Sequence, residues 1–340
     1  MSSITTLEQF LNRAGTQFRV FDLSRRVVPL SSEQFQQFEQ GLTPYPYPRA
    51  GYAWLGILFW DPNVAMQHYV WFLKWPLDEQ GLINPAARNQ FLQTIVEALG
   101  QDPTVNMTQQ QRWASNPFIF SPSEEKMAVF HANVRLALAQ PASVYYEAAQ
   151  EYFSGQRHWQ QWQTIGLQGV ADYAARLDPT HSRQLAYAIA QLPHEALLPM
   201  LSIFEHFQLA DVISQALLQR LQQESDELNK LTLLRGLAGS PQWLTPALTT
   251  QLQQPLSQDA LIIIAARLWL GLDHTNIPLY LDQLAQHPGM LFNQLYLDLV
   301  AQPHTRVWVL AELRNPQCSP ALTSAIHQLM NQMKTEGLHA

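Results

Sequence analysis

The chain has 340 residues, of which 47% are hydrophobic and 14% are charged, and its formal net charge is −7. Its length predicts more than one domain, and its hydrophobic content is sufficient for a sizeable core. The acidic balance argues against nucleic acid as a partner. Polyanion binding depends on clustered Lys and Arg, and the densest basic spot is the pair Arg25–Arg26.

The first hundred residues mix short helices with short strands. Capping residues mark the ends of three predicted helices, near 5–15, 31–41 and 84–100. Between the second and third helices the segment "TPYPYP" must be extended, because its alternating prolines cannot form a helix. This order predicts an α+β domain over residues 1–105, with a small antiparallel sheet and helices packed against it. The predicted strands are 18–22, 26–29, 52–60 and 67–75.

The strands 52–60 and 67–75 form a predicted hairpin that is rich in aromatic residues. Successive side chains of a strand point to opposite faces, and both faces of both strands are largely apolar here. A sheet that is apolar on both faces requires cover on both sides. The aromatic side chains that could form a partner-binding or domain-docking face are Trp54, Trp60, Tyr69, Trp71 and Trp75.

Three explanations of this aromatic surface remain open. The favoured one is packing within the chain, with the small N-terminal helices on one face and the helical region on the other. The second is contact with another protein molecule, either a partner or a second copy in a homodimer. The third is base stacking on the rings, against which the sparse Lys and Arg argue.

The polar stretch 106–120 is the expected linker, and the segments from 121 to 340 all predict helices. Many of the joints between these helices contain proline, which ends a helix. The chain is therefore expected to continue as an all-α domain over residues 121–340. The predicted helices are 122–139, 142–154, 157–177, 181–191, 194–207, 209–223, 225–238, 242–253, 257–271, 275–287, 289–301, 304–313 and 320–334.

A loose internal repeat is visible in the helical region. Three segments each contain an apolar helix, a short break and a second apolar helix, with the breaks at Ser240, Asp273 and Pro303. Their spacing of about thirty residues is typical of stacked helix pairs. We therefore expect a HEAT-like helical-repeat domain, an α-solenoid.

Motifs for cofactors and metals are absent from the sequence. No phosphate-binding glycine motif occurs, and "GLQG" at 166–169 favours close helix packing over a phosphate cradle. No metal-ligand spacing occurs either, so no cofactor or metal is expected.

Catalytic signals are equally weak. The candidates for acid–base chemistry are Glu124 and His131, seven residues apart on one predicted helix face. Placement of Glu124 and Glu125 at a helix N-terminus explains these carboxylates as well. Cys318, in a proline-flanked loop, is expected to be structural rather than nucleophilic. No catalytic residue is therefore assigned.

Cysteine content and hydropathy indicate the compartment. The single Cys318 excludes an intramolecular disulfide and fits a reducing environment. The N-terminus lacks the pattern of a signal peptide, and the longest apolar run, 260–272, is interrupted by Arg267. We expect a soluble, cytoplasmic protein that does not associate with membranes.

Several blocks together resemble an uncharacterised family of gammaproteobacterial proteins that is known only as a domain of unknown function. The blocks are "YVWFLKWPLDEQGL" (69–82), "SEEKMAVFHANVR" (123–135), "WQTIGLQGVADYAARL" (162–177) and "LFNQLYLDLVAQP" (291–303). The resemblance extends along most of the chain and implies a bacterial protein. It brings no activity with it, because none of these blocks is a catalytic signature.

Two functional hypotheses follow. The preferred one is a non-enzymatic scaffold that binds a protein or peptide on its helical repeats, since stacked helix pairs form extended surfaces. The alternative is an enzyme or small-ligand-binding protein with a pocket at the junction of the two domains. A deep pocket with buried ionisable groups would favour the alternative, whereas a broad shallow groove would favour the scaffold.

Overall fold

The computed structural model describes residues 4–64, 67–99 and 116–337. The chain divides into two compact units, Met1–Pro141 and Ala142–Ala340. The predicted linker, 106–120, falls mostly outside the described residues. Its last five residues, 116–120, belong to the first unit.

The N-terminal unit contains a four-stranded antiparallel sheet with the strand order β2-β1-β3-β4. The prediction of a small antiparallel sheet followed by helices is confirmed. The elements of this unit are α1 (Leu7–Arg13), β1 (Gln17–Asp22), β2 (Val28–Leu30), α2 (Ser32–Glu39), β3 (Tyr52–Trp60), β4 (Tyr69–Pro76), α3 (Pro85–Leu99) and α5 (Glu124–Ala137).

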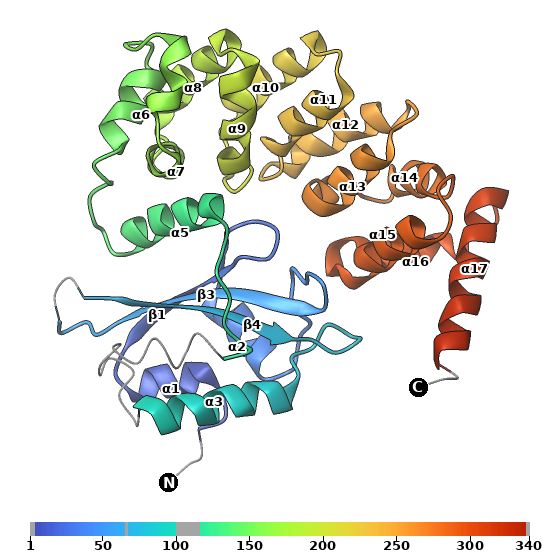
Figure 1. Ribbon diagram of the computed structural model, residues 1–340, viewed down its shortest axis with the longest axis horizontal. Coiled ribbons are helices and arrows are strands. Elements are labelled where there is room, and N and C mark those ends of the chain that lie inside the picture. Colours follow the sequence, from blue (N-terminus) through green and yellow to red (C-terminus); the bar gives the residue numbers. More distant parts are fainter. Residues whose placement is uncertain (1–3, 65–66, 100–115, 338–340) are drawn as a thin grey trace. The chain divides into compact units, whose positions relative to one another are not determined.

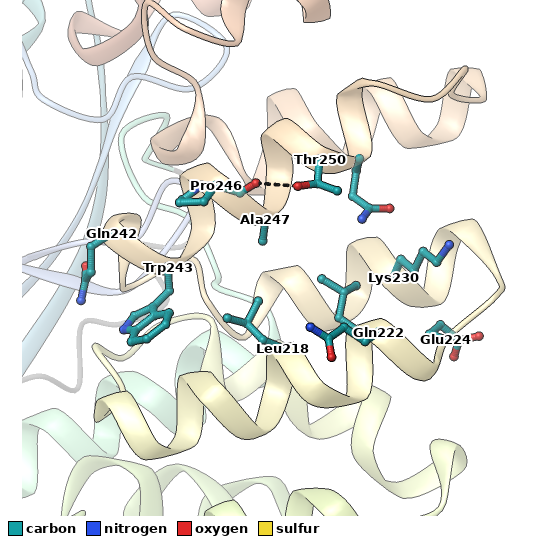
Figure 2. A pocket seen from close by; sticks show the side chains of 11 residues that line it. Leu218, Gln222, Glu224, Lys230, Gln242, Trp243, Pro246, Ala247 and Thr250 are labelled. Carbon is teal, nitrogen blue, oxygen red and sulfur yellow. Dashed lines mark hydrogen bonds between the residues drawn. The ribbon is translucent and has the colours of Figure 1, made fainter.

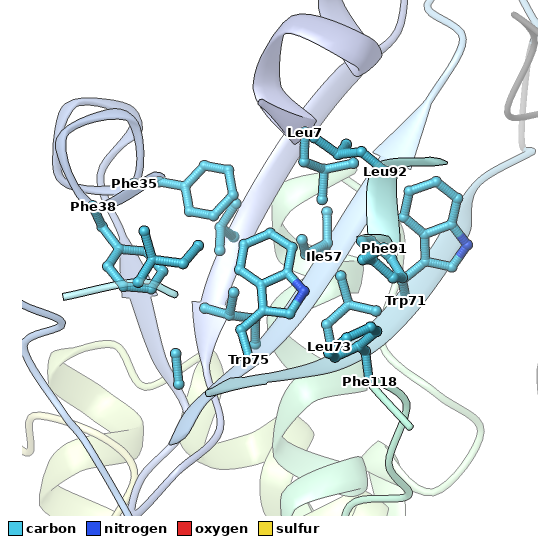
Figure 3. Close-up of a cluster of buried hydrophobic side chains, with 14 of the residues drawn as sticks. Leu7, Phe35, Phe38, Ile57, Trp71, Leu73, Trp75, Phe91, Leu92 and Phe118 are labelled. Atoms are coloured by element: carbon cyan, nitrogen blue, oxygen red, sulfur yellow. The ribbon is translucent and has the colours of Figure 1, made fainter. Parts of the chain in front are cut away.

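The helices α1, α2 and α3 cover one face of the sheet (Figure 1). Trp71 and Trp75 point to this face from β4 and pack edge-on against Phe91 of α3, with ring centroids 6.4 and 5.8 Å apart (Figure 3). Trp75 is fully buried and Trp71 nearly so. Two large rings in one core remove much apolar area from water, which makes this face the main hydrophobic core of the unit.

Helix α5 covers the middle of the opposite face (Figure 1). Its Phe130 ring contacts Phe21 of β1 and Phe72 of β4, with centroid distances of 5.3 and 5.1 Å. Gly56 of β3 allows this approach, because a Cβ there would lie 2.7 Å from Phe130 and 2.6 Å from Leu23. The hairpin is thus covered on both sides by helices of its own unit.

The place of α5 differs from the expected organisation. The sequence pattern assigned the helix 122–139 to the helical domain, whereas the first compact unit extends to Pro141 and includes α5. The physical reason is that Phe130, one of the buried residues of α5, packs on the sheet against Phe21 and Phe72. A linker in sequence therefore does not mark the limit of the unit.

The second unit, Ala142–Ala340, is mostly helical, as predicted. Its elements are α6 (Tyr146–Phe153), η2 (Trp159–Thr164), α7 (Leu167–Ala175), α8 (Pro179–Gln191), α9 (His194–Phe204), α10 (Asp211–Gln223), α11 (Glu227–Arg235), α12 (Pro241–Leu252), α13 (Gln258–Arg267), η3 (Trp269–Gly271), α14 (Ile277–Leu284), α15 (Met290–Ala301), α16 (Pro303–Glu312) and α17 (Pro320–Gly337). None of the helices in the described ranges is long and apolar enough to cross a membrane.

Two predicted helices are each divided in the structure. The segment 157–177 forms the 3₁₀ helix η2 and then α7, because Ile165 and Gly166 are extended between them. The segment 257–271 forms α13 and then the short η3, with Leu268 leaving the helical region. The hydrophobic pattern alone does not locate such breaks, because a short 3₁₀ segment or an extended pair of residues leaves no distinct periodic signal.

Helices of the second unit pack against the next helix but one in the chain. The helices α7, α9, α11, α13 and α15 follow one another in this way, and α8 packs along α10 as α14 does along α16. The chain thus runs back and forth between two rows. Buried leucines such as Leu201, Leu234 and Leu261 fill the space between the helices.

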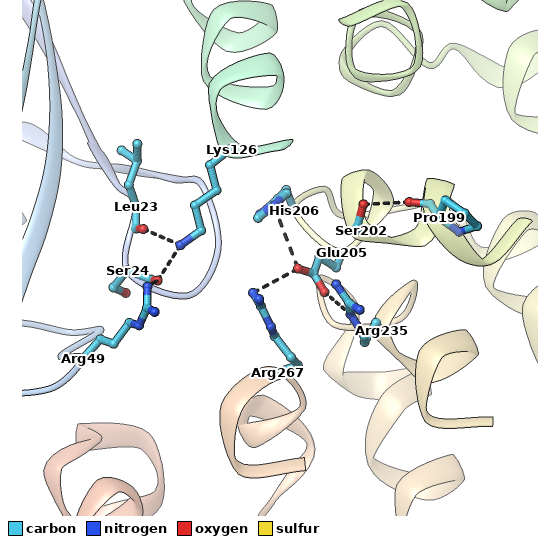
Figure 4. Close-up of polar contacts among 10 residues, drawn as sticks. All are labelled: Leu23, Ser24, Arg49, Lys126, Pro199, Ser202, Glu205, His206, Arg235 and Arg267. Atoms are coloured by element: carbon cyan, nitrogen blue, oxygen red, sulfur yellow. Dashed lines mark hydrogen bonds and ion pairs between the residues drawn. The ribbon is translucent and has the colours of Figure 1, made fainter. Parts of the chain in front are cut away.

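Glu205 joins the C-terminal ends of α9, α11 and α13, which are neighbours in the row α7, α9, α11, α13 and α15. This carboxylate, 2% exposed, follows α9 and accepts a 2.6 Å hydrogen bond from Arg235 Nε at the end of α11. Its other oxygen lies 3.3 Å from Arg267 Nη1 at the end of α13 (Figure 4). One buried anion therefore connects three successive helices.

Candidate functional site

An open groove lies between α10 and α12 in the helical unit, with a volume of about 570 Å³ (Figure 2). Its apolar lining consists of Leu218, Leu221, Trp243, Pro246 and Ala247. Its polar lining consists of Gln222, Glu224, Lys230, Gln242, Thr250 and Gln251. The groove thus combines an apolar surface with a border of mostly uncharged polar groups.

The groove exists because α10 and α12 do not pack side by side as closely as α8 and α10 do. Pro246 lies inside α12, where its ring prevents one backbone hydrogen bond of the helix. At one end Trp243 fixes the separation, since its Nε1 donates a 2.7 Å hydrogen bond to Asp211 Oδ1 at the start of α10. The indole is therefore held in a defined orientation beside the opening.

The charged side chains of the groove lie at the other end, near the turn between α10 and α11 (Figure 2). Glu224 Oε1 accepts hydrogen bonds from the backbone N–H groups of Ser225 and Asp226, at 2.8 and 2.9 Å. Its Oε2 lies 3.2 Å from His194 Nδ1. The backbone donors, Asp226 first, hold the pKa of Glu224 below its ordinary value, so this carboxylate is ionised and already has partners.

A second groove of about 500 Å³ follows between the end of α12 and α14. Its lining includes Leu252, Leu256 and Leu279, again with a glutamine-rich border. Gln283 belongs to the architecture of this groove, because its amide bonds Leu252 O and Leu256 N. Two open grooves thus follow one another around α12.

The N-terminal unit contains a different kind of polar centre, at the turn after β1. The carboxylate of Asp22 is buried and accepts hydrogen bonds from the Tyr45 and Ser24 hydroxyls, at 2.6 and 3.0 Å. Burial raises the pKa of Asp22 to about 7, although these hydrogen bonds and the Lys126 ammonium lower it in part. Asp22 therefore titrates near neutral pH.

Lys126 links this centre to α5. Its Nζ donates hydrogen bonds to the carbonyl oxygens of Leu23 and Ser24, at 2.7 and 2.6 Å (Figure 4). These bonds attach the first turn of α5 to the loop after β1. Their role is structural, because the Lys126 ammonium donates to backbone carbonyl groups of the loop that follows β1.

Replacing Asp22 with Asn is expected to remove part of the stability that the chain gains on acidification. The ordinary pKa of this carboxyl is 3.8, so between that value and 7 the folded chain holds a proton that the unfolded chain releases. Its stabilising contribution is present at low pH and is lost as pH rises through 7. Urea denaturation measures the free energy of unfolding of wild type and of Asp22→Asn. The difference between the two proteins should fall by roughly 2 kcal/mol from pH 5 to pH 8.

The matched control for this titration is Asp259→Asn, at an exposed position in the first turn of α13. It should keep the pH dependence of the wild type. An Asp22→Asn variant with the same pH dependence as wild type would contradict the assignment.

The five aromatic residues predicted as a docking face are divided between the two faces of the sheet. Trp71 and Trp75 lie in the main core, and Tyr69 stacks on Phe59 at its edge, 5.4 Å between centroids. Trp54 and Trp60, half-buried, lie on the opposite face. Trp54 contacts Phe120 at 4.8 Å, and its Nε1 donates to Arg49 O. The set does not form one continuous surface.

The acid–base candidates Glu124 and His131 lie on α5, both exposed. They are separated by two helical turns, about 10 Å along the axis, so the two side chains are not adjacent on the helix. Glu124 lies in the first turn of α5, where a carboxylate is favoured by the helix dipole. In the described ranges no group of three His, Cys, Asp or Glu side chains could hold a metal ion.

The second glycine of "GLQG", Gly169, serves helix packing. A Cβ on Gly169 would lie 2.5 Å from the carbonyl oxygen of Tyr145, so glycine lets α7 approach the start of α6. The prediction of a close helix contact is confirmed. Gly166, which precedes α7, has no neighbour within 4 Å of such a Cβ.

The residues of the α10–α12 groove were not predicted from sequence. Trp243 occurs in "GSPQWLTPAL", which the sequence pattern identified only as part of a repeat. A signal was nevertheless present, because a tryptophan beside two prolines interrupts an otherwise leucine- and glutamine-based helix pattern.

Comparison with known proteins identifies a family. A family model described as a protein of unknown function (DUF3549) matches residues 2–330. No curated protein and no solved structure matches the chain.

Proposed function

Because the chain belongs to this family of proteins of unknown function, we propose from geometry alone that its helical unit is a scaffold that binds a segment of a partner protein. The observation that carries this proposal is the open α10–α12 groove, with its oriented Trp243 and its apolar lining. Tryptophan in a partly exposed apolar site is the residue type that most often anchors a protein partner.

The arrangement of the helices supports the same proposal. Contacts between each helix and the next but one are those expected of a HEAT-like α-solenoid. In such an array the grooves between neighbouring helices repeat along the surface, as the α10–α12 and α12–α14 grooves do. A peptide lying across both grooves would contact three helices, which favours an elongated ligand.

The chemistry of the groove favours binding over catalysis. Its lining has one carboxylate, Glu224, which accepts hydrogen bonds from two backbone N–H groups and lies 3.2 Å from His194 Nδ1. An acid–base site would instead present an ionisable pair toward the bound molecule. The amide and hydroxyl groups of the border are suited to bonding a peptide backbone.

A displayed library of random peptides, selected on the full chain, tests the proposal. Ala247 lies in the groove lining, so Ala247→Arg should fill the groove and weaken binding of the selected peptides at least about tenfold. Fluorescence polarisation with the synthesised peptides measures the loss.

Gln219→Arg provides the matched control, because it adds the same side chain to the exposed side of α10 outside the groove. It should bind the peptides as wild type does. Selection of no peptide, or equal binding by the two arginine variants, would refute the proposed function.

A further inference from the structure

The charged groups of the groove between α10 and α12 differ in how they are paired. Its lining contains two charged side chains, Glu224 and Lys230. Glu224 accepts hydrogen bonds from two backbone N–H groups and lies 3.2 Å from His194 Nδ1. In the part of the chain that the structure describes, no carboxylate lies within ion-pair distance of the Lys230 ammonium. The groove therefore presents one unpaired positive charge in a chain of net charge −7.

The two ends of the groove differ in character. Trp243 stands at one end, and Lys230 stands at the other, near the turn between α10 and α11 (Figure 2). Leu218 and Ala247 lie between these ends. A ligand that fits both ends must carry a bulky apolar group and an anionic group separated along its length.

The border of the groove adds a third requirement. The side-chain amides of Gln222, Gln242 and Gln251 make no hydrogen bond to any described residue. Each amide can both donate and accept, which matches the alternating N–H and C=O groups of a peptide. These amides carry no charge, and Glu224 already accepts two backbone hydrogen bonds, so Lys230 is the charged group of the lining that is left to bind a ligand.

We propose that the occupant is an acidic peptide segment, with an aromatic or large aliphatic side chain at Trp243 and an Asp or Glu side chain at Lys230. This inference rests on the proposed function and specifies the partner. The half-buried position of Lys230 matters, because a charge pair that is partly removed from water is stronger than one on an open surface.

Sequencing of the peptides selected on the full chain gives the first readout. We expect Asp or Glu at a constant distance from Trp, Phe or Leu. Lys230→Gln should lower the affinity of a selected peptide about five- to tenfold and should leave the affinity of its Glu→Gln counterpart nearly unchanged. Lys230→Glu should select peptides with Lys or Arg at that position.

Lys334→Glu, at an exposed position of α17 outside the groove, is the control for a general charge effect. It should not change the peptide preference, and circular dichroism checks that each variant is folded. If Ala247→Arg abolishes binding while Lys230→Glu still prefers acidic peptides, the acidic specificity is wrong and the proposed function stands. If Ala247→Arg has no effect, both proposals fail.

Discussion

Replacing Gly56 with Val is expected to detach α5 from the sheet. A Cβ at this position would lie 2.6 Å from Leu23 Cδ1 and 2.7 Å from Phe130 Cε2, closer than carbon atoms pack. Valine adds two further methyl groups, and both neighbours belong to a buried layer that has little room to move. Overpacking of this kind costs about 1–3 kcal/mol and occasionally more.

Hydrogen exchange localises the effect of Gly56→Val. Amide protection should fall in α5 and should be retained in α9 and α11, which belong to the other unit. Gly166→Ala is the control, because its Cβ would have no neighbour within 4 Å. Unchanged protection of α5 in Gly56→Val would show that the helix does not depend on this contact.

Replacing Glu205 with Ala is expected to produce the other large loss of stability. The carboxylate is 2% exposed and bonds two arginines, at 2.6 and 3.3 Å, from the ends of α11 and α13. Without it the buried anion between these two cations, at the ends of α11 and α13, is missing. Removal of one partner from a buried ion pair costs about 3–5 kcal/mol. The partial exposure of Arg235 and Arg267 reduces the expected loss to about 2–3 kcal/mol.

Thermal unfolding followed by far-ultraviolet circular dichroism measures this loss, because the helices of the second unit dominate the signal. The matched control is Glu151→Ala. Glu151 pairs with Arg157 at 2.7 Å, and both side chains are at least one third exposed, so its loss should cost less than about 1 kcal/mol. Equal destabilisation by the two substitutions would contradict the role of Glu205 as a connection between helices.

Strand positions in the hairpin could be predicted well from sequence. The predicted strand 52–60 coincides with β3, because the hydrophobic run is bounded by Gly51 on one side and Asp61–Pro62 on the other. The need for cover on both faces also followed from the alternation. The identity of the covering helix did not, since the Gly56–Phe130 contact joins residues far apart in sequence and has no local signal.

The polar contacts of Lys126 and of Glu205 could not be predicted from sequence for a related reason. Lys126 and Leu23 are 103 residues apart, and Glu205 and Arg267 are 62 apart. A helix pattern identifies which side of a helix is buried, but it does not state which polar residue will meet which. The α10–α12 groove is still less accessible, because it depends on the distance between two helices that each look ordinary alone.

The outer strands of the sheet have a consequence for association. β2 has three residues, and Pro29 among them lacks an N–H group, so this edge offers few donors. Along β4 the segment 116–120 occupies the other edge, with Lys74 N donating to Phe118 O and Phe120 N donating to Phe72 O. Neither border is thus a ready template for strand addition, the first step of fibril growth and of many aggregation reactions. The chain can therefore contain an unusually apolar hairpin without that hairpin recruiting another by backbone pairing. A second copy of the molecule would have to bind through side-chain surfaces instead.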